Sequence, residues 1–200
     1  MADRPNERRA RFEAEVVPYL AVAYRVALSL THQEADAEDL VQESFLHAYR
    51  GFTGFQRGTN ARAWLLTIVR HTFFNLRRQA KSRPQVVQFT AVGERGSLAE
   101  PMDTQTPGPE EQAIQHLERE RLLRALAGVP EPFRTVVALV DLGELRYTEA
   151  AEVLGCPRGT VMSRLHRGRL LLAERLGMRA QPDDAEHNVV PALRWAGGAR

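Results

Sequence analysis

Two residue types are almost missing from this chain of 200 residues, cysteine and lysine. Cys156 is the single cysteine, which excludes an internal disulfide and a zinc site built from cysteines. Lys81 is the single lysine, so nearly all of the 27 basic residues are arginine. Arginine keeps its charge and makes two-point contacts with phosphate or guanine. The 25 acidic residues nearly cancel this charge, so only its distribution along the chain is informative.

Long apolar runs and strand-like alternation are also lacking. No apolar run reaches the roughly 20 residues of a membrane-spanning helix, and the N-terminus lacks the apolar segment of a signal peptide. We therefore expect a cytoplasmic protein without membrane insertion. Apolar residues recur mainly at helical spacing, which predicts an all-α fold.

Residues 147–169 have the pattern of a helix-turn-helix. Glycine and proline at 155–157 end one helix and begin the next. Val161, Leu165 and Leu172 form an apolar stripe on the second helix, and four arginines without a carboxylate occur between positions 155 and 170. A basic second helix is expected to enter a DNA major groove. The alternative is an arginine-rich surface helix in an ordinary helical hairpin.

The N-terminal part predicts several helices. Residues 9–30 have helical spacing, with a kink or break expected at Pro18. Another helix is expected to open at Asp36, where the stretch 34–43 holds five acids and no base. This acidic stretch is either a solvated face with favourable placement at a helix N-terminus or a docking face for a basic partner.

The segment 57–83 combines charge of one sign with aromatic rings. It holds seven basic residues, no acidic residue, and Trp64, Phe73 and Phe74. Arginine with stacking rings is typical of surfaces that bind single-stranded nucleic acid. The alternative is that the rings belong to the core, and Trp64 suits both roles. Phe52 and Phe55 lie in the preceding loop and are expected to be exposed.

A change of composition divides the chain. Residues 84–109 contain four prolines and little periodicity, as expected of a flexible linker. We therefore predict two small helical domains, over residues 9–83 and 110–177, joined by this linker and followed by a tail over 178–200.

Two motif blocks in this order resemble a known family. DAEDLVQESF followed by GTNARAWLLTIVRHTFFNLRR resembles region 2 of bacterial RNA polymerase sigma factors. PEPFRTVVALVDLGELRYTEAAEVLGCPRGTVMSRLHRGR resembles region 4. A linker of 26 residues without a third domain is similar to the extracytoplasmic-function (ECF) group of the sigma-70 family. FQRGTNARAWL and GTVMSRLHRGR look most like the branch that responds to thiol-oxidative stress.

The resemblance implies an alternative sigma factor, which binds core RNA polymerase, recognises the −35 and −10 promoter elements and promotes DNA melting. It implies no enzymatic activity, no cofactor and no metal site. Implied partners are promoter DNA and the polymerase core, through its β′ clamp helices and β flap. A zinc-containing anti-sigma protein, released in that branch by thiol oxidation, is also implied.

Three groups of site residues follow from the resemblance. The group that binds the β′ clamp helices is Asp39, Gln42 and Glu43. The −10 group is Phe55, Asn60, Trp64, His71, Asn75 and Arg77. The −35 group is Arg158, Thr160, Ser163, Arg164 and Arg167. One position departs from the family pattern, because many members have Asn where this chain has His71.

Two other classes of function are alternatives. A stand-alone helix-turn-helix regulator explains residues 147–169, but it needs a dimer seam and leaves 34–83 without a role. A nuclease would use Asp36, Glu38 and Asp39, but no histidine and aspartate constellation of metal type accompanies them. His166 is expected to contact phosphate or solvent, and Cys156 is expected to be an inert turn cysteine.

Overall fold

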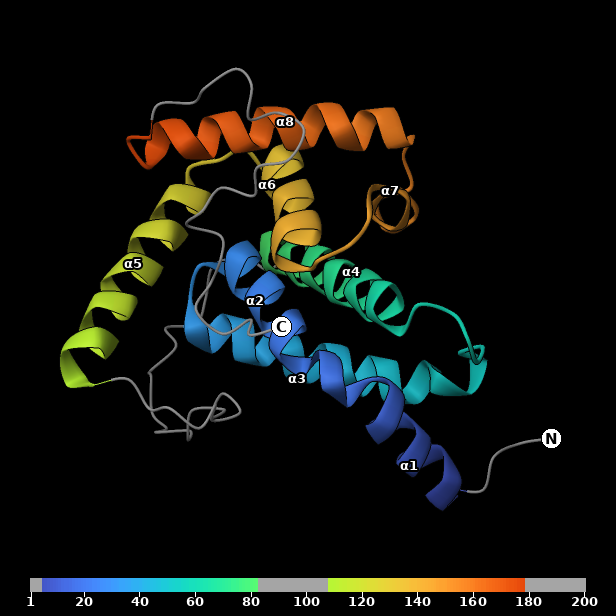
Figure 1. Cartoon of the computed structure of the whole chain (residues 1–200). Coiled ribbons are helices and arrows are strands. Elements are labelled where there is room, and N and C mark those ends of the chain that lie inside the picture. The colour runs from blue at the N-terminus through green and yellow to red at the C-terminus, as the bar shows by residue number, and fades with distance from the viewer. Residues whose placement is uncertain (1–4, 83–107, 179–200) are drawn as a thin grey trace.

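The computed structural model describes residues 5–82 and 108–178, and every regular element within them is helical (Figure 1). The elements of the N-terminal unit are α1 (Pro5–Glu15), η1 (Val17–Tyr19), α2 (Leu20–Thr31), α3 (Glu34–Gly51), η2 (Phe52–Gly54) and α4 (Ala61–Ser82). Those of the C-terminal unit are α5 (Pro109–Ala127), α6 (Glu131–Val137), η3 (Ala138–Leu142), α7 (Tyr147–Leu154) and α8 (Arg158–Arg175). The all-α prediction is confirmed. The expected linker and tail lie outside the described residues, except for 108, 109 and 178.

Pro18 breaks the first helical stretch, as predicted. It lies in the short η1 turn between α1 and α2, where its ring is incompatible with a continuous helix. The segment Asn6–Thr31 is apolar and long enough to pass a composition test for a membrane span. However, it is interrupted at η1, and α2 buries Ala23, Val26 and Leu30 in the protein. We therefore interpret α2 as a core helix.

An aromatic cluster holds α1, η2 and α4 together. Phe12 meets Phe52 edge to face at 5.3 Å between ring centroids, and Phe52 stacks on Phe55 at 5.5 Å. Trp64 lies 4.8 Å from Phe55. The expectation that Phe52 and Phe55 are exposed was wrong, since they are 1% and 6% exposed. The η2 turn folds both rings onto α1 and α4, where they lose contact with water.

The predicted helix-turn-helix is confirmed as α7, a turn and α8. Gly155 ends α7 with φ +62°, a left-handed conformation that glycine adopts without steric cost. Pro157 directly precedes α8. Helix α8 crosses α6 closely at Gly168, where a Cβ atom would lie 2.7 Å from the Val137 side chain and 3.1 Å from the Phe133 carbonyl oxygen.

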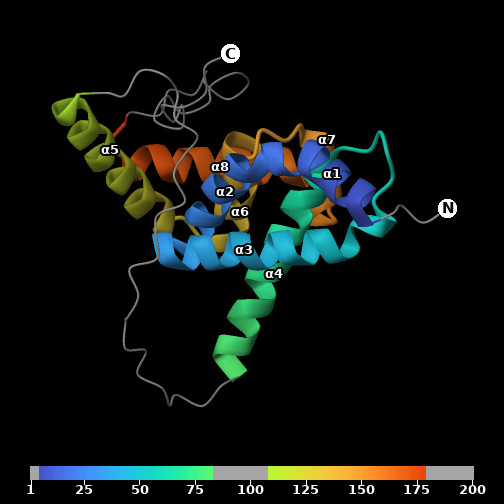
Figure 2. The same ribbon diagram turned by 90° about the horizontal axis from the view of Figure 1, so that it is seen from below.

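The two units pack directly against each other. Helix α4 contacts α7, and α2 contacts η3, α5 and α6 (Figures 1 and 2). The units approach closely at Gly143, where a Cβ atom would lie 2.8 Å from the Leu66 side chain of α4. The buried apolar side chains of both units form one continuous core. The units are thus held by contact within the described residues as well as by the chain that links them.

Candidate nucleic-acid and polymerase interfaces

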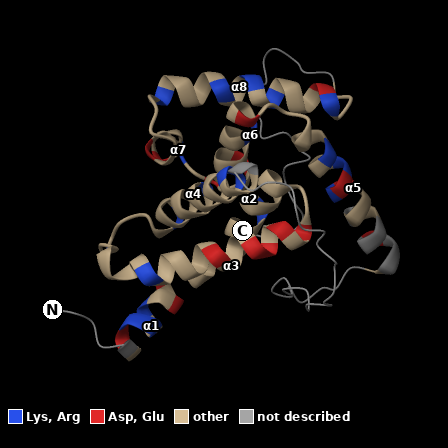
Figure 3. Ribbon diagram, turned by 180° about the vertical axis from the view of Figure 1, so that it is seen from behind, with Lys and Arg blue, Asp and Glu red and all other residues tan. Residues whose placement is uncertain are grey.

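The five residues of the expected −35 group lie along the N-terminal half of α8. Val161 and Leu165 turn inward and are buried, which directs the other faces of the helix outward. Arg158, Ser163 and Arg167 are exposed, whereas Thr160 and Arg164 are half-buried. The Ser163 hydroxyl donates to the Thr160 carbonyl oxygen at 3.1 Å. Basic residues recur along α8 (Figure 3). This face can present guanidinium groups to a DNA groove.

Not every arginine of α8 points outward. Arg169 faces Asp141 of η3, with its Nη2 2.6 Å from one carboxylate oxygen and its Nε 3.1 Å from the other. The Asp141 side chain is 1% exposed. The basic face of α8 therefore comprises Arg158, Arg164 and Arg167, while Arg169 fixes the helix to its own unit.

The expected −10 group begins at the N-terminus of α4. Asn60 caps this helix, because its Oδ1 accepts a hydrogen bond from the Ala63 N–H at 3.0 Å. Trp64 follows one turn later and is half-buried over Phe55. Because Phe55 is buried, it supports the Trp64 ring from beneath and has no face toward solvent.

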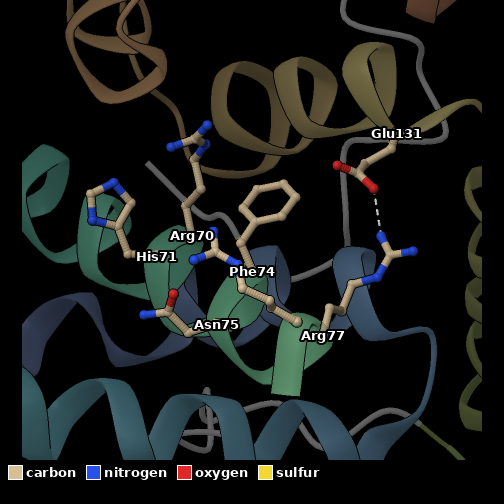
Figure 4. Close-up of a pocket in the computed structure, with 7 residues that line it drawn as sticks. Arg70, His71, Phe74, Asn75, Arg77 and Glu131 are labelled. Atoms are coloured by element: carbon tan, nitrogen blue, oxygen red, sulfur yellow. Dashed lines mark hydrogen bonds and ion pairs between the residues drawn. The ribbon is translucent and has the colours of Figure 1, made fainter. Parts of the chain in front are cut away.

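The remaining members of the −10 group meet in one pocket of about 630 Å³ on α4 (Figure 4). Exposed His71 and Asn75 line it with Arg77. Arg70, Phe74 and Arg78 also line it, from the basic and aromatic segment 57–83, although the sequence analysis did not assign them to the −10 group; Glu131 was not foreseen. The Arg70 guanidinium lies 5.1 Å from the centre of the Phe74 ring. The four-residue spacing of positions 70, 74 and 78 was the available signal, because it places side chains on one helix face.

This pocket combines groups suited to a nucleotide. Its three guanidinium groups attract phosphate, and its aromatic ring can contact a base. Glu131 is the carboxylate among its lining residues and comes from α6 of the other unit. Its Oε2 lies 2.5 Å from Nη1 of Arg77, as the dashed line in Figure 4 marks.

The acidic stretch predicted near Asp36 covers the first half of α3 (Figure 3). The helix begins at Glu34, two residues earlier than expected. Asp39 and Gln42 are exposed and Glu43 is half-buried, so the three residues of the expected polymerase-binding group share an accessible surface. Glu34 is engaged separately, since its Oε1 lies 3.3 Å from Nη2 of Arg119 on α5.

His32 is a titratable residue that the sequence analysis did not single out. It caps α2 in a left-handed conformation with φ +65°, and neither buried ring nitrogen has a hydrogen-bond partner. Burial lowers its pKa to about 4, and the nearby Arg134 guanidinium of α6 contributes in the same direction. The ring is therefore neutral at pH 7.

Metal binding has no geometric support in the part of the chain that the structure describes. Within residues 5–82 and 108–178, no three or more histidine, cysteine or carboxylate side chains gather as metal ligands would. Cys156 is half-buried in the turn before α8. The described surface carries a basic face on α8 and an acidic face on α3 (Figure 3).

Comparisons with known proteins agree with this organisation. Residues 16–83 match the family Sigma-70 region 2, and residues 119–172 match Sigma-70, region 4. The chain is 34% identical over 172 residues to the ECF RNA polymerase sigma factor EcfG of Rhodopseudomonas palustris, over 86% of this chain and 88% of that protein. It is 33% identical over 147 residues to the RNA polymerase sigma factor YlaC of Bacillus subtilis, over 73% and 80% of the two chains.

A solved structure extends the likeness to the fold. The chain resembles the sigma factor RpoE of Bartonella quintana, solved in complex with the anti-sigma factor NepR, with a TM-score of 0.63 and 26% identity. The match covers 85% of this chain and 99% of RpoE.

Proposed function

The chain belongs to the extracytoplasmic-function group of the sigma-70 family, and we propose how its surfaces serve transcription initiation. It is an alternative sigma factor, and its relatives are transcription initiation factors. The observation that carries this conclusion is the presence of regions 2 and 4 in one chain. A stand-alone helix-turn-helix regulator accounts only for region 4 and is not favoured.

We propose that α8 binds the −35 element. Arg158, Thr160, Ser163, Arg164 and Arg167 would contact base edges and phosphates in the major groove. This proposal is supported by the outward basic face of α8. The Arg169 and Asp141 pair holds the helix against its own unit. An exposed guanidinium can bind either guanine or phosphate, and the two roles differ in how strongly they depend on sequence.

The α4 surface is proposed to bind and melt the −10 element. Asn60, Trp64, His71, Asn75 and Arg77 would contact the unpaired strand, with Phe55 acting from beneath Trp64. Capture of an unstacked base offsets the few kcal/mol lost on melting. The pocket supports this role because arginines and an aromatic ring lie side by side there.

The exposed acidic face is proposed to bind the polymerase core. Asp39, Gln42 and Glu43 would contact the β′ clamp helices, and region 4 would contact the β flap. The domains would span residues 9–83 and 110–177, with 84–109 as the connection between them. Because the polymerase acts in the cytoplasm, the chain would act there too.

An anti-sigma protein is proposed as the regulator. The structural relative RpoE was solved bound to the anti-sigma factor NepR, and we extend this type of partner to the present chain. We further propose a zinc-containing partner of the thiol-oxidative-stress branch, which carries the redox sensor itself. Oxidant should then release Cys156→Ser as readily as wild type. Continued binding of Cys156→Ser under oxidant, with release of wild type, would place the sensor on this chain.

Run-off transcription tests the function as a whole. Purified chain is added to core RNA polymerase with a library of genomic fragments, and the transcripts are sequenced. Initiation at discrete sites that share two spaced elements is expected. If the core enzyme is active but no transcript depends on the added chain, the proposal is contradicted. The shared elements would also supply the promoter for the tests below.

A further inference from the structure

Carboxylates of region 4 contact region 2 along α4, the helix that we propose to bind the −10 element. Glu131 of α6 contacts Arg77, and Glu144, which precedes α7, contacts Arg62 with its Oε2 3.0 Å from Nη1. The Asn60 side chain, just before α4, also lowers the pKa of the Glu149 carboxyl group of α7. The ion pairs therefore lie near the start of α4, at Arg62, and toward its end, at Arg77.

Glu149 is held in its charged form by these contacts. Burial alone would raise the pKa of its carboxyl group, but the hydrogen bond from the Arg146 backbone N–H, together with the nearby Asn60 side chain, lowers the pKa below its usual range. The Arg146 N–H lies 2.8 Å from Oε2 of Glu149. The carboxylate is therefore an anion near the start of α4.

Glu144 makes two of these contacts with one carboxylate. Its Oε1 lies 3.2 Å from Nη2 of Arg25 on α2, while its Oε2 binds Arg62 on α4. Its backbone has φ +54°, a left-handed conformation that disfavours residues other than glycine. Two ion pairs to the other unit thus coincide with a backbone conformation that a glutamate rarely adopts.

Glu131 occupies the pocket that we propose for the unpaired strand. Its carboxylate reaches Arg77, on the other side of Phe74 from His71 and Asn75, where a phosphate group would find the same guanidinium (Figure 4). Carboxylate and phosphate compete for arginine because both accept hydrogen bonds from its planar fork. The side chains of Arg77 and Glu131 are 42% and 37% exposed, so solvent and a competing anion can reach the pair.

We propose that the packing of region 4 on region 2 and the capture of single-stranded DNA by α4 are mutually exclusive, with Glu131 and Glu144 occupying guanidinium groups of α4 that DNA takes when the units separate. This inference rests on the proposed role of α4. Residues 83–107 connect the units and, fully extended, would span about 80 Å. The covalent connection therefore permits separation, and the contacts described above favour closure.

The test measures closure and DNA binding separately on the full chain. Small-angle X-ray scattering reports the radius of gyration, and fluorescence anisotropy reports binding of a fluorescein-labelled oligothymidylate of about 15 nucleotides. The variants are Glu131→Gln, Glu144→Gly and their combination. Glycine adopts a positive φ without strain, so Glu144→Gly removes two ion pairs without disturbing the local backbone.

Opening should increase affinity for the oligonucleotide. Each partly exposed ion pair changes an equilibrium by up to about fivefold, so the combined variant should bind about tenfold more tightly than wild type and show a larger radius of gyration. The oligonucleotide should also expand the wild-type protein. The matched control is Glu174→Gln, which removes one charge, as each single variant does, on the exposed last turn of α8. It should alter neither quantity by more than about twofold, as expected of a solvated carboxylate.

A charge exchange gives a second test. Glu131→Arg and Arg77→Glu should each open the protein, and the double variant should restore closure because the pair is reversed. The double variant should still bind the oligonucleotide weakly, since it has lost the guanidinium of α4.

Three outcomes would overturn the inference. Glu174→Gln could raise affinity as much as the combined variant, which would indicate a general effect of charge. The combined variant could expand without binding more tightly, which would separate closure from DNA binding. In the third outcome, scattering shows expansion but none of the variants binds the oligonucleotide. That result would also refute the proposed −10 function of α4.

Discussion

Arg169 binds Asp141 through both carboxylate oxygens, at 2.6 and 3.1 Å, and thereby joins α8 to η3. Burial alone would lower the pKa of the Arg169 guanidinium, but the hydrogen bonds and charge of Asp141 raise it above its usual range. The arginine is therefore charged at pH 7. The helix that we propose to read DNA is positioned by this buried contact.

Breaking this pair should destabilise the protein. Asp141→Ala leaves a buried guanidinium without its partner and is expected to lower the free energy of unfolding by about 3–5 kcal/mol. Urea denaturation would measure the loss. Replacing both residues with apolar ones, as Asp141→Leu with Arg169→Met, should recover most of it. Arg167→Ala, an exposed change on the same helix, is the control. A loss in Asp141→Ala no larger than in this control would show that the pair contributes nothing.

Arg164 should contribute to recognition of the −35 element. Arg164→Ala is expected to weaken promoter binding by about 1–3 kcal/mol if the guanidinium contacts a base edge. Binding should be compared on the identified promoter and on versions with altered −35 sequences. Arg175→Ala, near Gly128 at the other end of α8, is the matched control. Equal weakening on every −35 sequence would assign Arg164 to phosphate contact alone.

Trp64 should matter more for melting than for initial binding. Trp64→Ala is expected to reduce open-complex formation because unpaired bases appear only after the strands separate. Permanganate reactivity of promoter thymines measures the open complex, and a binding assay on duplex DNA measures the earlier step. Ile68→Ala, half-buried one turn later, controls for lost packing on α4. Normal thymine reactivity in folded Trp64→Ala would restrict the ring to the aromatic cluster.

Charge reversal on α3 should weaken binding to the polymerase core. Asp39→Arg and Glu43→Arg place basic groups on the surface proposed to meet the β′ clamp helices, so affinity should fall while −35 DNA binding is unchanged. Titration of labelled chain with core enzyme would show the difference. Glu13→Arg on α1 is an exposed control. Unaltered polymerase affinity in both α3 variants would leave the acidic stretch as a solvated face.

His32 should make stability fall in acid. Its pKa of about 4 in the folded protein lies below the ordinary value of 6.5, so the unfolded chain binds the proton more readily. Above pH 6.5, titration of His32 should not change the free energy of unfolding. As pH falls from 6.5 toward 4, it should lower the free energy of unfolding. Thermal midpoints of wild type and His32→Asn, compared across this range, isolate its contribution, because asparagine tolerates the left-handed backbone. Parallel curves for the two proteins would contradict this expectation.

Local signals made much of this molecule predictable from sequence. Pro18 and Gly155 each impose a backbone constraint that does not depend on distant residues, and the break and the turn occur where they indicated. Phe55 was misjudged because loop position suggested exposure. Its burial depends on Phe52 and Trp64, which come from other elements, and no local pattern encodes that meeting.

The contacts between the two units could not be predicted from the sequence, for a related reason. Glu131 and Glu149 each lie in the first turn of a helix, where a carboxylate is already favoured by the helix dipole. Nothing local distinguishes an acid that stabilises its own helix from one that also reaches another domain. The pocket on α4 was foreseen in large part, since His71, Asn75 and Arg77 were assigned to the −10 group and Phe74 and the arginines belong to the predicted basic and aromatic segment, but Glu131 was not foreseen.

Gly168 is the position at which α8 passes closest to the neighbouring backbone among its glycines. The helix meets α6 at this position, where even a methyl group would approach the Val137 side chain and the Phe133 carbonyl. Gly168 therefore helps, with the buried Val161 and Leu165, to fix the rotation of α8 about its own axis, and it lies outside the exposed positions of segment 158–167. Exposed positions in that segment are free to diverge without repacking the interior. A lineage that kept Gly168 would be able to change the DNA sequence it prefers by single substitutions at exposed positions, because the packing of α8 on α6 would stay the same.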